Sequence, residues 1–153
     1  MPDKNTGIPS EIELKLLFAP EDRLLLDRCI TMKMGAPPAV IHSLLTTYYD
    51  TPDLLLSHAG LALRVRKIGR KRIQTLKSQG DDSSLASSRG EWEWIIKTDE
   101  PDLDLLSGTP AEELRPKLLG KLQPIWLSDV QRTIHMLEYA GATVELAIDE
   151  GTV

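Results

Sequence analysis

The chain has 153 residues, of which 41% are hydrophobic and 27% are charged. This length suffices for one domain with its own core, and the composition is that of a globular protein. A net charge of -5 argues against a general nucleic-acid binder, which would be basic overall, and no apolar run is long enough to span a membrane. The single cysteine, Cys29, excludes an internal disulfide. Because the N-terminus has no apolar segment of the signal-peptide type, we expect a cytoplasmic protein.

The first predicted element is a strand over residues 11–18, in which charged and apolar residues alternate. Alternate side chains of a strand share a face, so Glu11, Glu13 and Lys15 fall together. Two carboxylates on one face could hold a cation, and the lysine could hold an anion. A strand with one wet face has the same pattern, so this row becomes informative only if other strands repeat it.

Further along the chain, turn and periodicity signals alternate. A helix is expected from Pro20 to about Gly35. The elements expected after it are a strand over 40–49, a helical turn over 54–58, a hairpin of 61–67 and 71–77, a loop over 78–88, a strand over 91–97, two short helical segments between 101 and 120, and a final hairpin of 125–139 and 143–149. This gives about seven strands with helices between them and no sign of a second domain.

The separation of charged from apolar side chains recurs in these strands. Trp92 and Trp94 occupy one face of their strand, and two tryptophans predict a face packed under helices. The charged sets on the opposite faces are Arg64 and Arg66; Lys77; Arg89, Glu91 and Glu93; Arg132; and Glu145 with Asp149. If every apolar face packs outward, the charged faces converge inside a curled sheet, and a barrel of about eight strands can enclose one small ligand. Carboxylates suit a hard divalent cation, and arginine and lysine suit phosphate oxygens.

In these residues the chain resembles the CYTH domain family, also called the triphosphate tunnel metalloenzymes, and in particular its bacterial inorganic triphosphatases. The motifs that carry the resemblance are Glu11, Glu13 and Lys15 as E-x-E-x-K; Tyr49-Asp50-Thr51 followed by Leu55; Leu63-Arg64-Val65-Arg66; Thr75-Leu76-Lys77; and Arg89-Gly90-Glu91-Trp92-Glu93. They extend through nearly the whole chain. The resemblance implies an α+β fold in which a closed or nearly closed antiparallel eight-stranded β-barrel forms a tunnel, with helices packed outside. Residues 1–153 would be a single domain of this kind.

The resemblance also implies a site with a cofactor, Mg2+ or Mn2+, and a small-molecule polyphosphate substrate. The expected metal ligands are Glu11, Glu13, Glu91, Glu93, Glu145 and Asp149. The expected substrate-binding residues are Lys15, Arg64, Arg66, Lys77, Arg89 and Arg132. Glu13, Lys15 and Arg66 are the expected catalytic residues. The implied reaction is metal-dependent hydrolysis of inorganic triphosphate to pyrophosphate and phosphate, in which the cation neutralises phosphate charge while a water attacks the terminal phosphorus.

Two positions depart from the family pattern. Val130 stands where many members have a lysine two residues before Arg132. The sequence ends at Val153, before the strand in which the family usually carries a further E-x-E pair, so we expect the final strand to be missing.

Other activities fit the same residues. Within the family, these are thiamine triphosphatase and adenylyl cyclase, and outside enzymes, a non-catalytic module that binds polyphosphate or nucleotide. We expect no nucleic-acid or membrane partner, and a homodimer is compatible with an open sheet edge that needs covering.

Overall fold

A computed structural model describes residues 10–79 and 87–152 of the chain, with the backbone alone described for residues 10–13, 33 and 87–89. The strands are β1 (Ser10–Glu13), β2 (Val40–Asp50), β3 (Leu61–Ile68), β4 (Lys71–Ser78), β5 (Ser87–Ile96), β6 (Gln123–Tyr139) and β7 (Ala142–Thr152). The helical segments are η1 (Pro20–Asp22), α1 (Arg23–Arg28), η2 (Cys29–Lys33), α2 (Leu55–His58), η3 (Leu103–Leu106), η4 (Glu112–Leu114) and α3 (Arg115–Leu118). None of the helices in these described ranges is long and apolar enough to cross a membrane.

The strands follow the order β1-β5-β4-β3-β2-β6-β7. The pairs β1–β5, β3–β4, β4–β5 and β6–β7 are antiparallel. The α+β class and the count of seven strands are therefore confirmed for the part of the chain that the structure describes. The order is linear, with β1 and β7 at its ends, so closure into an eight-stranded barrel stays a prediction.

The chain divides into two compact units. The first unit consists of Met1–Leu14 and Leu45–Ser128, and the second consists of Lys15–Leu44 and Asp129–Val153. Single-domain behaviour over residues 1–153 likewise stays a prediction.

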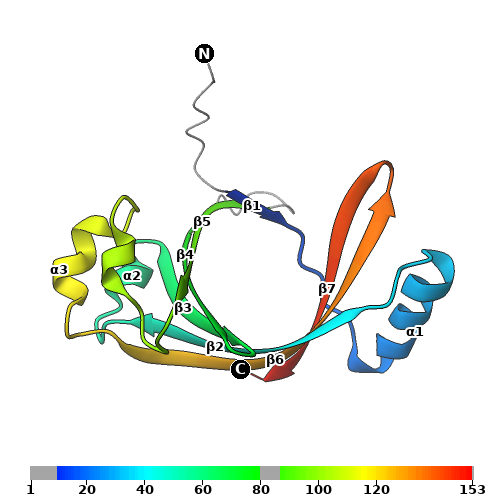
Figure 1. Cartoon of the computed structure of the whole chain (residues 1–153), viewed down its shortest axis with the longest axis horizontal. Coiled ribbons are helices and arrows are strands. Elements are labelled where there is room, and N and C mark those ends of the chain that lie inside the picture. The colour runs from blue at the N-terminus through cyan, green and yellow to red at the C-terminus, as the bar shows by residue number, and fades with distance from the viewer. Residues whose placement is uncertain (1–9, 80–86, 153) are drawn as a thin grey trace, which may run out of the picture. The chain divides into compact units, whose positions relative to one another are not determined.

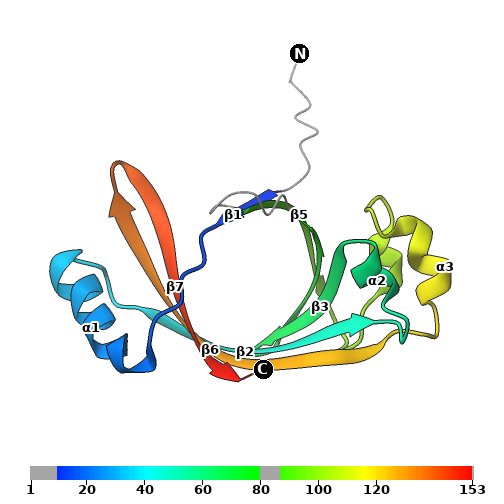
Figure 2. The same ribbon diagram turned by 180° about the vertical axis from the view of Figure 1, so that it is seen from behind.

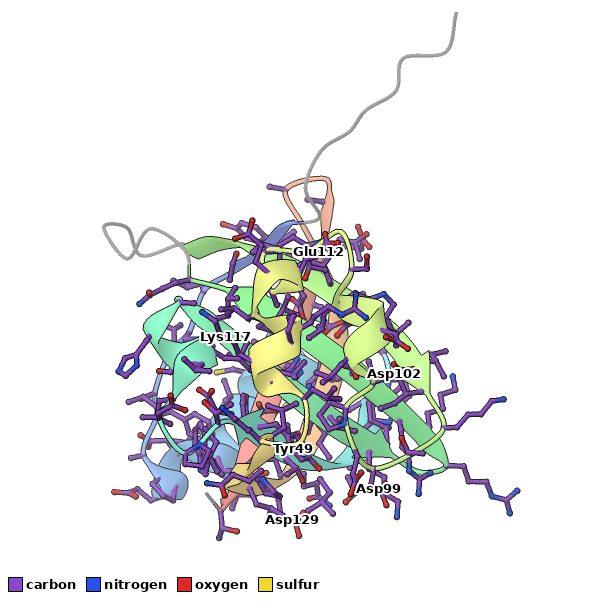
Figure 3. The ribbon with its side chains drawn as sticks, turned by 90° about the vertical axis from the view of Figure 1, so that its left-hand side faces the viewer. Tyr49, Asp99, Asp102, Glu112, Lys117 and Asp129 are labelled. Atoms are coloured by element: carbon purple, nitrogen blue, oxygen red, sulfur yellow. The ribbon has the colours of Figure 1, made fainter. Side chains whose placement is uncertain are left out.

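The first unit is built on the curved run of strands β3, β4 and β5. Gly69, with φ of 57°, lies in the turn between β3 and β4 in a left-handed conformation that glycine adopts without strain. The helices α2 and α3 lie together on the outer side of this curve (Figures 1 and 2). Figure 3 looks onto that side, where the segment that carries Glu112 and Lys117 lies in front of the strands.

Apolar side chains fill the layer between these strands and helices. Leu56, Leu76, Leu106 and Leu118 are fully buried there. Trp92 and Trp94 pack against the same cluster, which confirms that their face of β5 lies under helices. We call this side of β3–β5 the helix-covered face; its residues are Leu61, Leu63, Val65, Gln74, Leu76, Trp92 and Trp94.

The second unit contains α1, η2 and the β6–β7 hairpin. Ala140 and Gly141, with φ of 51° and 80°, make the turn of the hairpin, as the sequence predicts. Ile30, Leu137 and Ile148 form a small buried cluster in this unit. Its apolar core is therefore much smaller than that of the first unit.

The strand expected over residues 11–18 is shorter than predicted. Strand β1 covers only Ser10–Glu13, and its last residue pairs with Ser87, the first residue of β5. Residues 14–18 belong to no strand, so Lys15 lies outside β1. In the loop expected over 78–88, residues 80–86 lie outside the described part of the chain.

Candidate functional site

The register of β3, β4 and β5 gathers charged side chains on the side opposite the helix-covered face. Arg64 pairs with Thr75, Thr75 with Glu93, and Lys77 with Glu91. Because side chains of paired residues lie on the same side of a sheet, these residues face one another across neighbouring strands. We call this set the charged face; its residues are Arg64, Arg66, Thr75, Lys77, Glu91 and Glu93. For these strands, the predicted convergence of charged rows is confirmed.

One carboxylate of the charged face lies between two cations. The Oε2 atom of Glu91 is 3.1 Å from Nζ of Lys77, and its Oε1 atom is 3.6 Å from Nη2 of Arg64. The longer distance exceeds that of a normal charge-assisted hydrogen bond, so the pairing with Arg64 is loose. Glu91 therefore contacts both Lys77 and Arg64 on this face.

Arg64 has a hydrogen-bond donor that no described residue satisfies. The residue is only 9% exposed, and its buried Nε atom has no acceptor among the described residues. Leaving a buried polar donor unpaired costs about 1–3 kcal/mol, and more when the group is charged. An oxygen of a bound anion would satisfy this donor, and the planar guanidinium is suited to holding a phosphate by two parallel hydrogen bonds.

Two buried threonines contact members of the charged face. The hydroxyl of Thr46, on β2, accepts a hydrogen bond of 2.9 Å from Nε of Arg66. The hydroxyl of Thr75 donates a hydrogen bond of 3.1 Å to Oε1 of Glu93. Both threonines are almost fully inaccessible to solvent, at 1% and 0% exposed. Sequence reasoning missed the role of Thr46, because its contact depends on β2 lying beside β3.

Three further predicted residues lie on β1 and at the start of β5, where only the backbone is described. Glu11 pairs in register with Arg89, and Glu13 pairs with Ser87. Glu91 follows Arg89 by two residues on β5, so β1 brings Glu11 to the strand that carries two residues of the charged face. The side chains of Glu11, Glu13 and Arg89 lie outside the described part of the structure.

The remaining predicted residues belong to the second unit, so they are not part of the charged face, which lies in the first unit. Arg132 pairs with Asp149 across the β6–β7 hairpin, with Nε 2.7 Å from Oδ1 and Nη2 2.6 Å from Oδ2. This is a two-point contact between a guanidinium and a carboxylate. Glu145 lies exposed on β7, and Lys15 is exposed after β1. Their predicted roles as ligands stay predictions.

A divalent cation fits the donor chemistry of the charged face. Glu91 and Glu93 supply carboxylate oxygens, which Mg2+ and Mn2+ prefer. Within the side chains that the structure describes, no group of three or more histidine, cysteine or acidic residues is placed to hold a metal ion. Two further predicted ligands, Glu11 and Glu13, lie on β1, which pairs with β5.

An aromatic pair was also missed by sequence reasoning. The rings of Tyr48 and Trp126 stack with their centroids 4.9 Å apart, and Trp126 is 48% exposed. Tyr48 follows Thr46 by two residues on β2, so both side chains point to the side of the strand where Thr46 meets Arg66. The alternation of β2 could have placed Tyr48, but no local pattern signals that Trp126 meets it.

Comparison with known proteins agrees with this arrangement. The model of the CYTH domain matches residues 9–153 of the chain. A protein from Haemophilus influenzae named inorganic triphosphatase is 32% identical over 144 residues, which cover 94% of this chain and 40% of that protein. The chain therefore spans about two fifths of the length of that relative.

Solved structures show the same fold at lower identity. HpAC1 from Hippeastrum, described as having a dominant triphosphatase activity, is 19% identical with a TM-score of 0.54, over 92% of this chain and 77% of that one. The PH1012 protein from Pyrococcus horikoshii OT3 is 22% identical with a TM-score of 0.51, over 92% and 70% of the two chains. At such identities these similarities establish the fold alone.

Proposed function

Because the chain belongs to the CYTH domain family, we propose that it is a metal-dependent triphosphatase that hydrolyses inorganic triphosphate to pyrophosphate and phosphate. The observation that carries this proposal is the buried Nε of Arg64, a charged donor with no acceptor within the part of the chain that the structure describes. It lies on a face that holds two further cations. A phosphate oxygen provides the missing acceptor. The named activity of the Haemophilus influenzae relative supports the inorganic substrate.

In the proposed mechanism, Arg64, Arg66 and Lys77 bind phosphate oxygens and hold the chain of phosphates along β3 and β4. Their positive charges stabilise the charge that develops on the departing oxygens. The loose 3.6 Å contact between Arg64 and Glu91 allows the guanidinium to turn to a phosphate without losing a strong ion pair. Arg89, Lys15 and Arg132 are further proposed contacts for the substrate.

The acidic residues have a separate proposed role. Glu91 and Glu93, with Glu11 and Glu13 from β1, would hold Mg2+ or Mn2+. Glu145 and Asp149 of β7 stay predicted metal ligands. When bound, the cation supplies neutralisation of phosphate charge and lowers the pKa of a coordinated water. Glu13, Lys15 and Arg66 are the proposed catalytic residues.

The test is phosphate release from tripolyphosphate with Mg2+, repeated with excess chelator. We expect release that the chelator abolishes and that Arg66→Met strongly reduces. Undiminished release in the chelator would contradict the metal dependence. Binding without any release would instead identify a non-catalytic polyphosphate-binding module.

A second candidate is hydrolysis or cyclisation of a triphosphate that carries an organic ring, as in a thiamine triphosphatase or an adenylyl cyclase. The stacked pair of Tyr48 and Trp126 favours it, because an aromatic surface near the charged face can stack on a planar ring. Turnover of ATP and thiamine triphosphate should be compared with that of tripolyphosphate in wild type and Trp126→Leu. Equal effects of this substitution on all three substrates would exclude a role of the pair in selecting a ring.

A further inference from the structure

Thr46 and Thr75 are buried residues whose hydroxyls hydrogen-bond to charged side chains, and Thr75 is itself part of the charged face. They belong to β2 and β4, and they are 1% and 0% exposed. A buried hydroxyl needs a hydrogen-bond partner, and each of these finds one in a charged side chain of the candidate site. No bound substrate could touch hydroxyls that are so thoroughly covered.

Threonine is well suited to fixing a neighbour. A β-branched side chain in a strand has few accessible χ1 rotamers, so the direction of its hydroxyl is set by the backbone. Arginine and glutamate, in contrast, have long side chains with several rotatable bonds. A hydrogen bond from a stiff partner therefore removes conformations that the charged group would otherwise sample.

The atoms that form these two hydrogen bonds determine which part of each charged side chain is oriented. Thr46 accepts from Nε of Arg66, the guanidinium nitrogen nearest the stem, so the contact fixes the plane in which the two outer nitrogens lie. Thr75 donates to Oε1 of Glu93, so the contact fixes how the second carboxylate oxygen is presented. One cation, Arg66, and one carboxylate, Glu93, are thus each oriented by a buried threonine.

We propose that Thr46 and Thr75 are positioning residues of the triphosphate site, Thr46 for the phosphate-binding guanidinium of Arg66 and Thr75 for the carboxylate of Glu93. This rests on the proposed function of the charged face. Preorganised groups bind a ligand more tightly because less freedom is lost on binding. Thr46 should therefore govern the affinity for tripolyphosphate, whereas Thr75 should govern the dependence of turnover on the metal concentration.

The first test is calorimetric titration of tripolyphosphate without metal. Thr46→Val keeps the shape of the side chain and removes the hydroxyl, and we expect about tenfold weaker binding, the size of a hydrogen bond to a charged group. Thr46→Ser should restore most of the affinity. Thr47→Val is the matched control, because the neighbouring residue points to the other side of β2.

A double-mutant cycle separates positioning from a general structural effect. If Thr46 acts through Arg66, Thr46→Val should change the affinity little in a protein that already carries Arg66→Met. An equal loss in both backgrounds, or no loss in the wild-type background, would overturn the proposal for Thr46. For Thr75→Val, we expect a higher Mg2+ concentration at half-maximal turnover with little change in tripolyphosphate affinity, and an unchanged Mg2+ dependence would overturn its role.

Failure of the proposed function gives a different result. If the wild-type protein binds no tripolyphosphate and Arg66→Met changes nothing, the charged face is not a triphosphate site, and the positioning proposal falls with it. If the wild-type protein binds and Arg66→Met weakens binding while Thr46→Val does not, only the positioning proposal fails.

Discussion

The two faces of the β3–β5 sheet carry opposite kinds of residues although they come from the same strands. In β4, Leu76 is fully buried under the helices, while its neighbours Thr75 and Lys77 belong to the charged face. The helix-covered face buries apolar side chains, and their removal from water stabilises the folded protein. On the charged face, Glu91 lies between Lys77 and Arg64, and the buried Nε of Arg64 has no acceptor among the described residues.

We propose that this difference separates the residues that stabilise the fold from those that bind the ligand. Apolar burial stabilises the folded state, whereas a buried charged donor without an acceptor lowers the stability of the ligand-free protein. Such a face is expected where a charged ligand supplies the missing partners. Substitutions on the two faces should therefore affect different measurements.

The largest expected effect is on stability, from Leu76→Ala on the helix-covered face. A fully buried leucine replaced by alanine lowers the free energy of unfolding by about 2–5 kcal/mol, because apolar contacts are lost and a cavity remains. Urea unfolding measures this change. Leu119→Ala, at a leucine that is 73% exposed, is the control with a small expected effect. A Leu76→Ala protein that is as stable as wild type would break the assignment of this face.

A somewhat smaller effect is expected from Arg64→Met, on affinity. A hydrogen bond to a charged group contributes about 1.5–3 kcal/mol, which corresponds to roughly tenfold to a hundredfold weaker binding of tripolyphosphate. Calorimetric titration measures the affinity. Arg70→Met changes the net charge equally at an exposed position in the β3–β4 turn and should have little effect. An equal loss in both variants would show that only overall charge matters.

Lys77→Met should weaken binding less than Arg64→Met. Lysine acts on a phosphate as a point charge rather than as a two-point fork. The expected loss is about fivefold, corresponding to about 1 kcal/mol, and Lys77→Arg should recover it. The same titration, repeated at several salt concentrations, should show the difference between wild type and Lys77→Met shrinking as salt rises. A larger loss for Lys77→Met than for Arg64→Met would contradict the assigned order.

The smallest expected effect concerns alkaline stability and Tyr49, which packs in the helix-side cluster with Val65 and Ile96. Burial, followed by the negative charges of Glu100 and Asp99, raises the pKa of Tyr49 above its ordinary value of 10.0. A raised pKa contributes stability that is fully present below pH 10.0 and is lost as pH rises through the folded-state pKa. The difference in free energy of unfolding between wild type and Tyr49→Phe should therefore shrink as pH rises above 10.0.

Urea unfolding of both proteins at several pH values from 8 to about 11 measures this effect. At neutral pH, Tyr49→Phe also lacks the 2.8 Å hydrogen bond that the hydroxyl donates to the carbonyl oxygen of Asp99. Tyr139→Phe, at an exposed tyrosine, is the control. A constant difference between wild type and Tyr49→Phe at all pH values would contradict the assigned shift.

Alternation along single strands explains why so much of the first unit could be predicted. The two tryptophans of β5 and the arginines of β3 fall on opposite faces by the period of a strand alone, and the turn at Gly69 joins two strands that are neighbours in sequence. The same local signals placed the β6–β7 hairpin.

Features that depend on residues far apart in the chain escaped prediction. The contact of Thr46 with Arg66 joins β2 to β3 across 20 residues that include α2. The stack of Tyr48 on Trp126 joins β2 to β6, which lie far apart in the chain. Among the described residues, the buried Nε of Arg64 has no acceptor. This depends on the geometry of the side chain, which no sequence pattern predicts.

The measurement that tests the central claim most directly follows the Nε–H group of Arg64 by 1H–15N NMR while tripolyphosphate is added. Its resonance can be assigned by its loss in Arg64→Lys, and that of Arg72, which is paired with Asp99, serves as an internal reference. If a phosphate oxygen becomes the missing acceptor, the Arg64 signal should shift in proportion to occupancy while the Arg72 signal stays in place. An Arg64 signal that does not move at saturating tripolyphosphate would contradict the claim that the charged face binds the triphosphate.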